Sequence, residues 1–435
     1  MKISLRRLTL LILPLFALLK LDAQSGLQIQ YQPEEITAQF YQPAFLAIHP
    51  MKSFSAGLGT AYEAGSNALT VSSLFMNDSY ISESEKDNLV GQLGDNNRLH
   101  LGFTQSAIAA FEIKKQRISL SYRDYQNGYF RINNPATAGI VLYGNAPYAG
   151  QTISDENITL RNFSYRELAI GSAWQMGDLA FGVRLRALMG KYGNFTEDLN
   201  YSLFTASDGS DIRLNSSYEI FNGSGGAGLG ADLGLIYQPK PTLMIQAAVR
   251  DLGFISWNGT QRVNEVNISY QGINLNQFID TDFSSGGRLF TPDTLEKLFF
   301  PDSTAGNFRL NLAPLASLAG SWEFSSGKTV SLAFVQGLSK YSAPAPLVNL
   351  GYAHKIARPL TLGVNVYIGG MEGYGWGGFA RGNFMLAEKY HASVFIAADN
   401  ASGLITPQSA GGFAFQGGIT FRMAPELPAS ATPAR

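Results

Sequence analysis

The sequence contains no cysteine in its 435 residues, which excludes disulfide bonds, thiolate metal sites and thiol nucleophiles. Basic and acidic residues nearly balance, at 32 and 33, and no basic cluster occurs, so we expect no nucleic-acid partner. Charged residues make up only 15% of the chain, against about 25% in ordinary soluble domains. The composition therefore points away from a soluble protein.

Motifs for catalysis and cofactor binding are also missing. The four histidines (His49, His100, His354 and His391) are far apart and lack the close spacing of metal ligands. Nucleotide-binding loops, dinucleotide fingerprints and serine nucleophile elbows are absent. We therefore expect no enzymatic activity, no cofactor and no metal site.

Long apolar runs are absent beyond the N-terminus, where none reaches the roughly 18 residues of a membrane helix. The first residues are basic and precede an apolar core from Leu8 to Leu19, with a small residue at Ala23. This pattern predicts a signal peptide over residues 1–23, cleaved near Ala23, because the core is too short for a membrane anchor. No cysteine follows the core, which excludes a lipoprotein anchor.

What the sequence does have is alternation between apolar and small or polar residues, from Ser53 to Met423. In Leu179–Met189, apolar residues at every second position oppose Gly182, Arg184 and Arg186. Strands of this kind present one face to lipid and the other to a lumen. About fifteen such runs can be counted, whereas bacterial barrels have even numbers. We predict an all-β fold: a transmembrane antiparallel up-and-down β-barrel of 14–16 strands over residues 53–423.

The connections between these runs alternate between short turns and long polar loops, as in outer-membrane barrels with periplasmic turns and extracellular loops. Within the loops, Pro135–Tyr143 and Pro292–Phe300 have helical character, and Ser202–Phe221 predicts a hairpin. The predicted long loops are Asn77–Arg98, Asn133–Arg161, Tyr192–Gly225, Trp257–Leu310, Ser339–Ala345, Gly369–Gly375 and Asp399–Ala410.

Aromatic residues near the run ends fit the girdle that such barrels place at the membrane interfaces. They are Tyr122, Tyr125, Trp174, Tyr192, Tyr237, Trp257, Trp322, Tyr352 and Trp376. The girdle supports the barrel prediction, although an aromatic content of 12% places some of these residues there by chance.

The two ends of the mature chain lie outside the alternating region. Residues 24–52 lack a strand period, and we expect them to form either a plug in the lumen or an ordered lead-in. The last strand, Gly412–Met423, carries a candidate assembly signal at Gln416, Gly418, Phe421 and Met423. Residues 424–435 contain three prolines, which cannot continue a hydrogen-bonded ladder, so a disordered periplasmic tail is predicted.

Charged residues on the expected lumen faces are the candidate site residues. The basic ones are Arg117, Arg123, Arg184, Arg186, Arg381 and Arg422, and the acidic ones are Glu112, Glu167, Asp232 and Glu323. One interpretation is a lattice of salt bridges that stiffens the wall and fills the lumen, because charges in a closed interior are costly unless paired. The other is a charged ring that selects anionic solutes.

Three stretches carry a resemblance to a known family: Tyr165-Arg166-Glu167, the glycine-rich Gly228–Gly234, and Asp251-Leu252-Gly253-Phe254-Ile255-Ser256-Trp257. From about Tyr41 to Met423, the chain resembles a family of Bacteroidota outer-membrane barrels of unknown function. Its layout is similar to fatty-acid-transporter-like barrels and to barrels associated with type IX secretion. Members often carry Asn-Pro-Ala near the start, where this chain has Gln42-Pro43-Ala44. The family has no established binding residues to carry over.

These observations predict an outer-membrane protein of a Gram-negative bacterium. Its expected function is that of a transporter or passive pore for small or hydrophobic solutes. The alternative is a scaffold or shuttle in type IX-like protein secretion or surface assembly, with Trp257–Leu310 long enough to hold a secretion or surface protein. Either function implies contact with outer-membrane lipid and with the barrel-assembly machinery.

Overall fold

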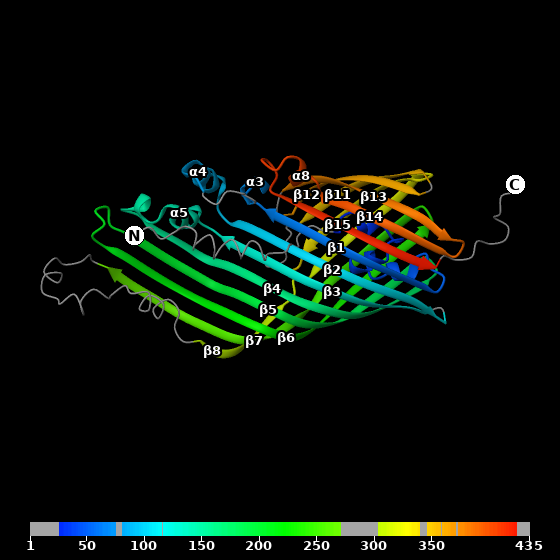
Figure 1. Ribbon diagram of the computed structural model, residues 1–435, viewed down its shortest axis with the longest axis horizontal. Helices are drawn as coiled ribbons and strands as arrows, with labels where there is room; N and C mark the ends of the chain where they lie inside the picture. Colours follow the sequence, from blue (N-terminus) through cyan, green and yellow to red (C-terminus); the bar gives the residue numbers. More distant parts are fainter. Residues whose placement is uncertain are drawn as a thin grey trace.

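The computed structural model describes residues 26–74, 81–114, 116–270, 303–339, 346–357, 359–370 and 373–423. These residues contain fifteen strands in one antiparallel sheet, which closes where β15 (Gly412–Met423) pairs with β1 (Phe54–Ser66) (Figure 1). The others are β2 (Asn97–Ile113), β3 (Gln116–Ile132), β4 (Thr152–Met176), β5 (Leu179–Thr205), β6 (Ile212–Lys240), β7 (Leu243–Tyr270), β8 (Thr304–Asn311), β9 (Leu315–Ser325), β10 (Lys328–Gly337), β11 (Leu347–Ala357), β12 (Leu360–Gly369), β13 (Tyr374–Ala387) and β14 (Tyr390–Asn400).

The odd number of strands arises at β7. One edge of β7 pairs with β6, while its other edge pairs with β9 over Leu243–Arg250 and with β8 over Phe254–Gln261. Strands β8 and β9 therefore share one position in the wall as the two halves of an interrupted strand. Fifteen strands less this shared position give a closed barrel of 14 strands, within the predicted range.

Strands β4 to β7 are much longer than predicted, and they extend beyond β9 to β14 at one end of the barrel (Figure 1). The prediction of a loop over Tyr192–Gly225 was wrong, because β5 continues to Thr205 and β6 begins at Ile212. The alternation signal fails there since polar residues and glycines, as in Tyr192-Gly193-Asn194, replace the apolar row. The loop predicted over Trp257–Leu310 is likewise shortened by the end of β7 and by β8.

Short helices lie in the connections between strands. The predicted helix Pro135–Tyr143 is α5, and the predicted hairpin Ser202–Phe221 is the tip of the β5–β6 pair; both are confirmed. Pro292–Phe300 lies outside the described residues. The remaining helices of the described loops are α3 (Val71–Leu74), α4 (Glu83–Gln92), η3 (Ala146–Tyr148) and α8 (Ser402–Ile405). No described helix is long and apolar enough to cross a membrane.

The apolar faces of the strands point out of the barrel, as predicted for a lipid-facing belt. Leu185 on β5 is 57% exposed, whereas its neighbours Arg184 and Arg186 are 1% and 2% exposed on the lumen side. Trp174, Trp322 and Trp376 are exposed, as a girdle requires. Two girdle assignments were wrong: Trp257 is completely buried, and Tyr125 lines a lumen cavity.

Residues 26–52, which we call the plug, occupy the lumen. They form η1 (Ile29–Tyr31), η2 (Ile36–Phe40) and α2 (Phe45–Ile48), seen in blue inside the barrel in Figure 1. Ile36 and Phe45 are fully buried, in one apolar core with wall residues that include Phe379 and Phe395.

Glycines on the lumen face let the plug approach the wall. A Cβ on Gly182 would lie 2.3 Å from the backbone of Pro43 and Ala44, and one on Gly57 would lie 2.4 Å from the Ile36 side chain. The wall at these positions has room for a hydrogen atom and for nothing larger.

Candidate functional site

A cluster of six charged side chains, which we call the arginine cluster, lies on the lumen face of five neighbouring strands. It consists of Arg123 (β3), Glu167 (β4), Arg184 and Arg186 (β5), Asp232 (β6) and Asp251 (β7). Pairing is partly set by strand register, since Arg123 is opposite Glu167 and Arg184 is opposite Asp232. The three guanidinium groups and three carboxylates balance in charge.

The contacts inside the cluster are short and shared. Arg123 reaches Glu167 at 2.8 Å and Arg184 reaches Asp232 at 2.7 Å. Arg186 reaches Asp251 at 2.7 Å and Glu167 at 3.1 Å, and Arg184 also pairs with Glu167. The plug residue Phe40 lies under two of these guanidinium groups, with its ring centre 4.7 Å from Arg184 and 5.6 Å from Arg123. The cluster thus contacts the plug through cation–π geometry.

The other three predicted arginines lie apart from this cluster and hold two parts of the plug. Arg117 donates to the carbonyls of Leu46, Ala47 and His49, at the C-terminal end of α2, and pairs with Glu112 at 3.0 Å. Cations at this end of a helix satisfy its free carbonyls.

The remaining two arginines meet at Glu34. Arg381 pairs with the Glu34 carboxylate at 2.6 Å, and Arg422 donates to the Glu34 carbonyl at 3.1 Å. The predicted acid Glu323 accepts from the Gly327 N–H at the short turn between β9 and β10, and among the described residues it makes no hydrogen bond or ion pair with the plug.

The first turn of the plug is held by a residue that the sequence analysis did not single out, Asp399 on β14. Its carboxylate accepts from the N–H groups of Gly26 and Gln28, both at 2.8 Å, and from Gln416 Nε2 at 2.6 Å. Gln246 on β7 donates to the Gln30 carbonyl at 2.7 Å. Side chains on opposite sides of the barrel therefore fix η1 across the lumen.

The four candidate assembly residues on β15 occupy different surroundings. Gln416 points into the lumen, as its bond to Asp399 shows, and Gly418 lies near Thr37 of the plug. Phe421 stacks on Tyr390 at 5.6 Å, and the Met423 carbonyl accepts from the Lys52 N–H at 2.8 Å.

Two cavities flank η1, and we name them the outer and the inner chamber. The outer chamber, of about 160 Å³, is lined from the plug by Leu27, Ile29 and Gln30 among others. The inner chamber, of about 540 Å³, lies among the short turns and is lined from the plug by Gln28, Tyr31 and Gln32, among others. Successive residues of one short segment thus face opposite chambers, so the segment 26–32 is a partition one layer thick.

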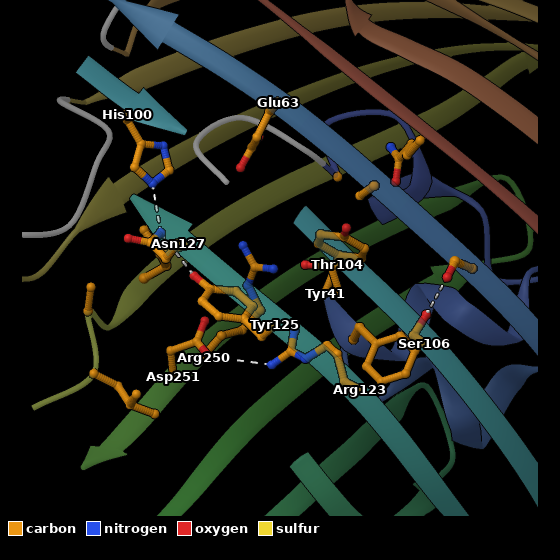
Figure 2. Close-up of a pocket in the computed structure, with 18 of the residues that line it drawn as sticks. Tyr41, Glu63, His100, Thr104, Ser106, Arg123, Tyr125, Asn127, Arg250 and Asp251 are labelled. Carbon is orange, nitrogen blue, oxygen red and sulfur yellow. Dashed lines mark hydrogen bonds and ion pairs between the residues drawn. The ribbon is translucent and has the colours of Figure 1, made fainter. Parts of the chain in front are cut away.

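The outer chamber has two unlike sides. Strands β1 to β4 supply mostly polar and aromatic groups, many of them labelled in Figure 2, including Glu63, His100, Asn127 and Tyr125. The opposite side, around β8 to β11, is apolar except for Asn311: Leu310, Leu312, Ala313, Leu315, Val335 and Leu347. A ligand seated here would meet hydrogen-bonding groups on one side and aliphatic carbon on the other.

A bulge in β7 places two consecutive residues toward this chamber. Asp251 and Gly253 have positive φ angles of 58° and 150°, at the gap between β8 and β9. Arg250 and Asp251 therefore both line the chamber, although strand neighbours normally face opposite sides. The bulge also shifts the alternation beyond it, which turns Trp257 inward and explains the incorrect girdle assignment.

Comparisons with solved structures give similar barrels at low identity. A Pseudomonas aeruginosa FadL homologue aligns with a TM-score of 0.49 and 12% identity, covering 92% of this chain and 94% of that one. The Pseudomonas putida toluene transporter TodX aligns at 0.46 and 10%, covering 93% and 95%. The monoaromatic hydrocarbon channel CymD aligns at 0.44 and 10%, covering 93% and 94%.

No curated protein sequence matches the chain significantly. A family model does match it, over residues 43–222 and 194–387, and its description is a family of unknown function, DUF5723. Since these two matches together span most of the sequence, this barrel belongs to the DUF5723 family.

Proposed function

We propose that this chain is a gated outer-membrane transporter for small or hydrophobic solutes. The observation that carries the proposal is the partition: residues 26–32 line both a chamber on the loop side and a chamber on the turn side, and so lie between them. A passive pore needs a continuous opening, whereas here the plug fills the lumen between the two cavities.

The gate we propose is η1 together with its flanking residues, and the rest of the plug is the fixed frame. An ion pair with Arg381 and a hydrogen bond from Arg422 hold Glu34, and three carbonyls around the end of α2 are bound by Arg117. By contrast, η1 is held by hydrogen bonds, chiefly those of Asp399 and Gln246. Hydrogen bonds to a charged group contribute about 1.5–3 kcal/mol each, so loss of the two bonds to the Asp399 carboxylate would loosen this segment, whose displacement would join the chambers.

The location we propose is the outer membrane of a Gram-negative bacterium, of Bacteroidota type as the sequence resemblance suggests. The exposed apolar face of the wall would contact lipid, and the barrel-assembly machinery would insert β15 next to β1. Residues 1–23, which lie outside the described residues, would be removed as a signal peptide. We further propose that the arginine cluster is a structural lattice, because its charges already balance one another.

The alternative function, a scaffold for secreted or surface proteins, was motivated by the long loop after Trp257. Residues 271–302 of that loop lie outside the described part of the chain. The partition between two chambers is a feature of a transport route and has no role in a scaffold, so we place the transporter first.

Loosening the partition tests this function. In Asp399→Ala, the N–H groups of Gly26 and Gln28 lose their acceptor, and we expect higher single-channel conductance in planar bilayers than for the native protein. Asp208→Ala, which changes an exposed loop carboxylate, is the matched control and should conduct like the native chain. Heat-modifiable migration on gels checks that both variants are folded. Equal conductance of native protein and a folded Asp399→Ala variant would reject the gate.

A further inference from the structure

Arg250 differs from the other cations of the outer chamber. Three arginines line that chamber, and two of them are paired: Arg123 with Glu167 at 2.8 Å, and Arg161 with Glu197. Arg250 has no carboxylate within 4.0 Å and no side-chain hydrogen bond among the residues that the structure describes. Its guanidinium instead lies over the ring of Tyr41, 5.0 Å from the ring centre.

A half-buried guanidinium that makes no ion pair among the described residues can bind an anion in a narrow lumen. The neighbouring acid does not fill it, because Asp251 points its carboxylate at Arg186, 2.7 Å away. Asp251 and Glu63 nevertheless add negative charge to the chamber lining, so a ligand with two negative charges would be repelled. The site therefore favours a single negative charge.

The size and the apolar side of the chamber limit the rest of the ligand. A volume of about 160 Å³ is close to that of an engineered cavity, about 150 Å³, that accepts benzene. Leu310, Leu312 and Leu315 offer an aliphatic surface on the side where β8 gives way to β9. We propose that the outer chamber binds a small organic monocarboxylate with a compact apolar body, and that Arg250 pairs with its carboxylate.

The same contact links the ligand to the partition, a step that rests on the proposed function. Tyr41 packs against Gly26: a Cβ on Gly26 would lie 2.1 Å from the Tyr41 ring, and Gly26 has a φ of 98°. Gly26 is the first residue of the partition and is bound by Asp399. A carboxylate that pairs with the N–H edge of Arg250 would lie beside the Tyr41 ring that stacks on the guanidinium, so a ligand in the chamber would be linked to Gly26 through Tyr41. Figure 2 shows Tyr41 and Arg250 among the residues around this pocket.

Binding is tested by calorimetric titration of the detergent-purified full-length protein with sodium benzoate and with benzyl alcohol, its neutral counterpart of similar size. Benzoate should bind at least about tenfold more tightly than benzyl alcohol, a difference of about 1.4 kcal/mol. Arg250→Gln should abolish that preference, and Arg250→Lys should retain part of it. Arg309→Gln, which removes an exposed arginine stacked on Phe254 outside the chamber, is the matched control.

Equal binding of the two compounds, or an unchanged preference in a folded Arg250→Gln variant, would overturn the assignment. The result is independent of the gate, because titration in detergent requires no transport. If benzoate binds through Arg250 while Asp399→Ala leaves conductance unchanged, the carboxylate site stands and the gate fails. If benzoate shows no preference that depends on Arg250 while Asp399→Ala raises conductance, the gate stands and the carboxylate site fails.

Discussion

Gly182 lies where the wall packs against the backbone of the plug, and replacing it with alanine tests whether that contact is tight. The added Cβ would lie 2.3 Å from backbone atoms of Pro43 and Ala44, whereas ordinary contact begins at 3.4 Å. The plug must therefore move by 3.4 minus 2.3, or about 1 Å, and its backbone cannot rotate away as a flexible side chain would.

The expected loss of stability follows from two opposing effects. Overpacking of a filled interior costs about 1–3 kcal/mol. Replacing glycine by alanine in a strand returns about 0.5–1 kcal/mol through reduced backbone freedom. We expect Gly182→Ala to be destabilised by about 1 kcal/mol, and by at most about 2.5 kcal/mol, measured from the urea midpoint of tryptophan fluorescence in micelles.

Gly320→Ala is the matched control for this substitution. Gly320 is on β9, where the nearest atom to an added Cβ is 3.7 Å away, so the variant should be as stable as the native protein or slightly more stable. Bilayer conductance provides a second measurement, since a displaced plug should leak. The reasoning is refuted if Gly182→Ala matches Gly320→Ala in both urea midpoint and conductance.

Two further predictions follow from the charge cluster and the last strand. Glu167→Gln leaves Arg123, Arg184 and Arg186 with two carboxylates, and removing one partner of a buried ion pair costs about 3–5 kcal/mol, so the urea midpoint should fall sharply. A midpoint unchanged from native would show that the cluster adds nothing to stability. Phe421→Asp places a charge on the outer face beside Tyr390 and should lower outer-membrane levels in cell fractionation, whereas deletion of residues 424–435 should not. Normal levels for Phe421→Asp, or loss on tail deletion alone, would place the assembly signal elsewhere.

The sequence predicted the barrel because lipid on one side and a lumen on the other impose a strict period of two. That signal ends where the wall leaves the membrane, which is why the upper parts of β5 and β6 read as a loop. It also cannot reveal that β8 and β9 share one position, because strand counting has no information about pairing. The missed ends of β5 and β6 and the miscounted strand show the same limit. Alternation reports whether the two faces of a strand have different surroundings, and it does not report where a strand without that difference lies or which strands pair.

The candidate site was predictable in part. Arg123, Arg184, Arg186 and Asp232 were expected in the lumen from their place on the polar faces, and they meet in one cluster. Asp251 and Arg250 were missed, because a bulge turns both inward and a pattern of period two assigns them to opposite faces. Asp399 was missed because its importance depends on a plug that touches the wall more than 370 positions away in sequence.

The unequal strand lengths give the barrel an oblique rim. With a rise of about 3.3 Å per residue and a tilt near 40°, the 10 residues of β12 reach a height of about 25 Å, which equals the apolar band of such barrels. The 29 residues of β6 reach about 70 Å on the same assumptions. One flank of the molecule would then stand about 45 Å above the membrane surface while the opposite flank ends at it. Molecules would approach the chamber sideways, across the low flank, because the tall flank closes the opposite side.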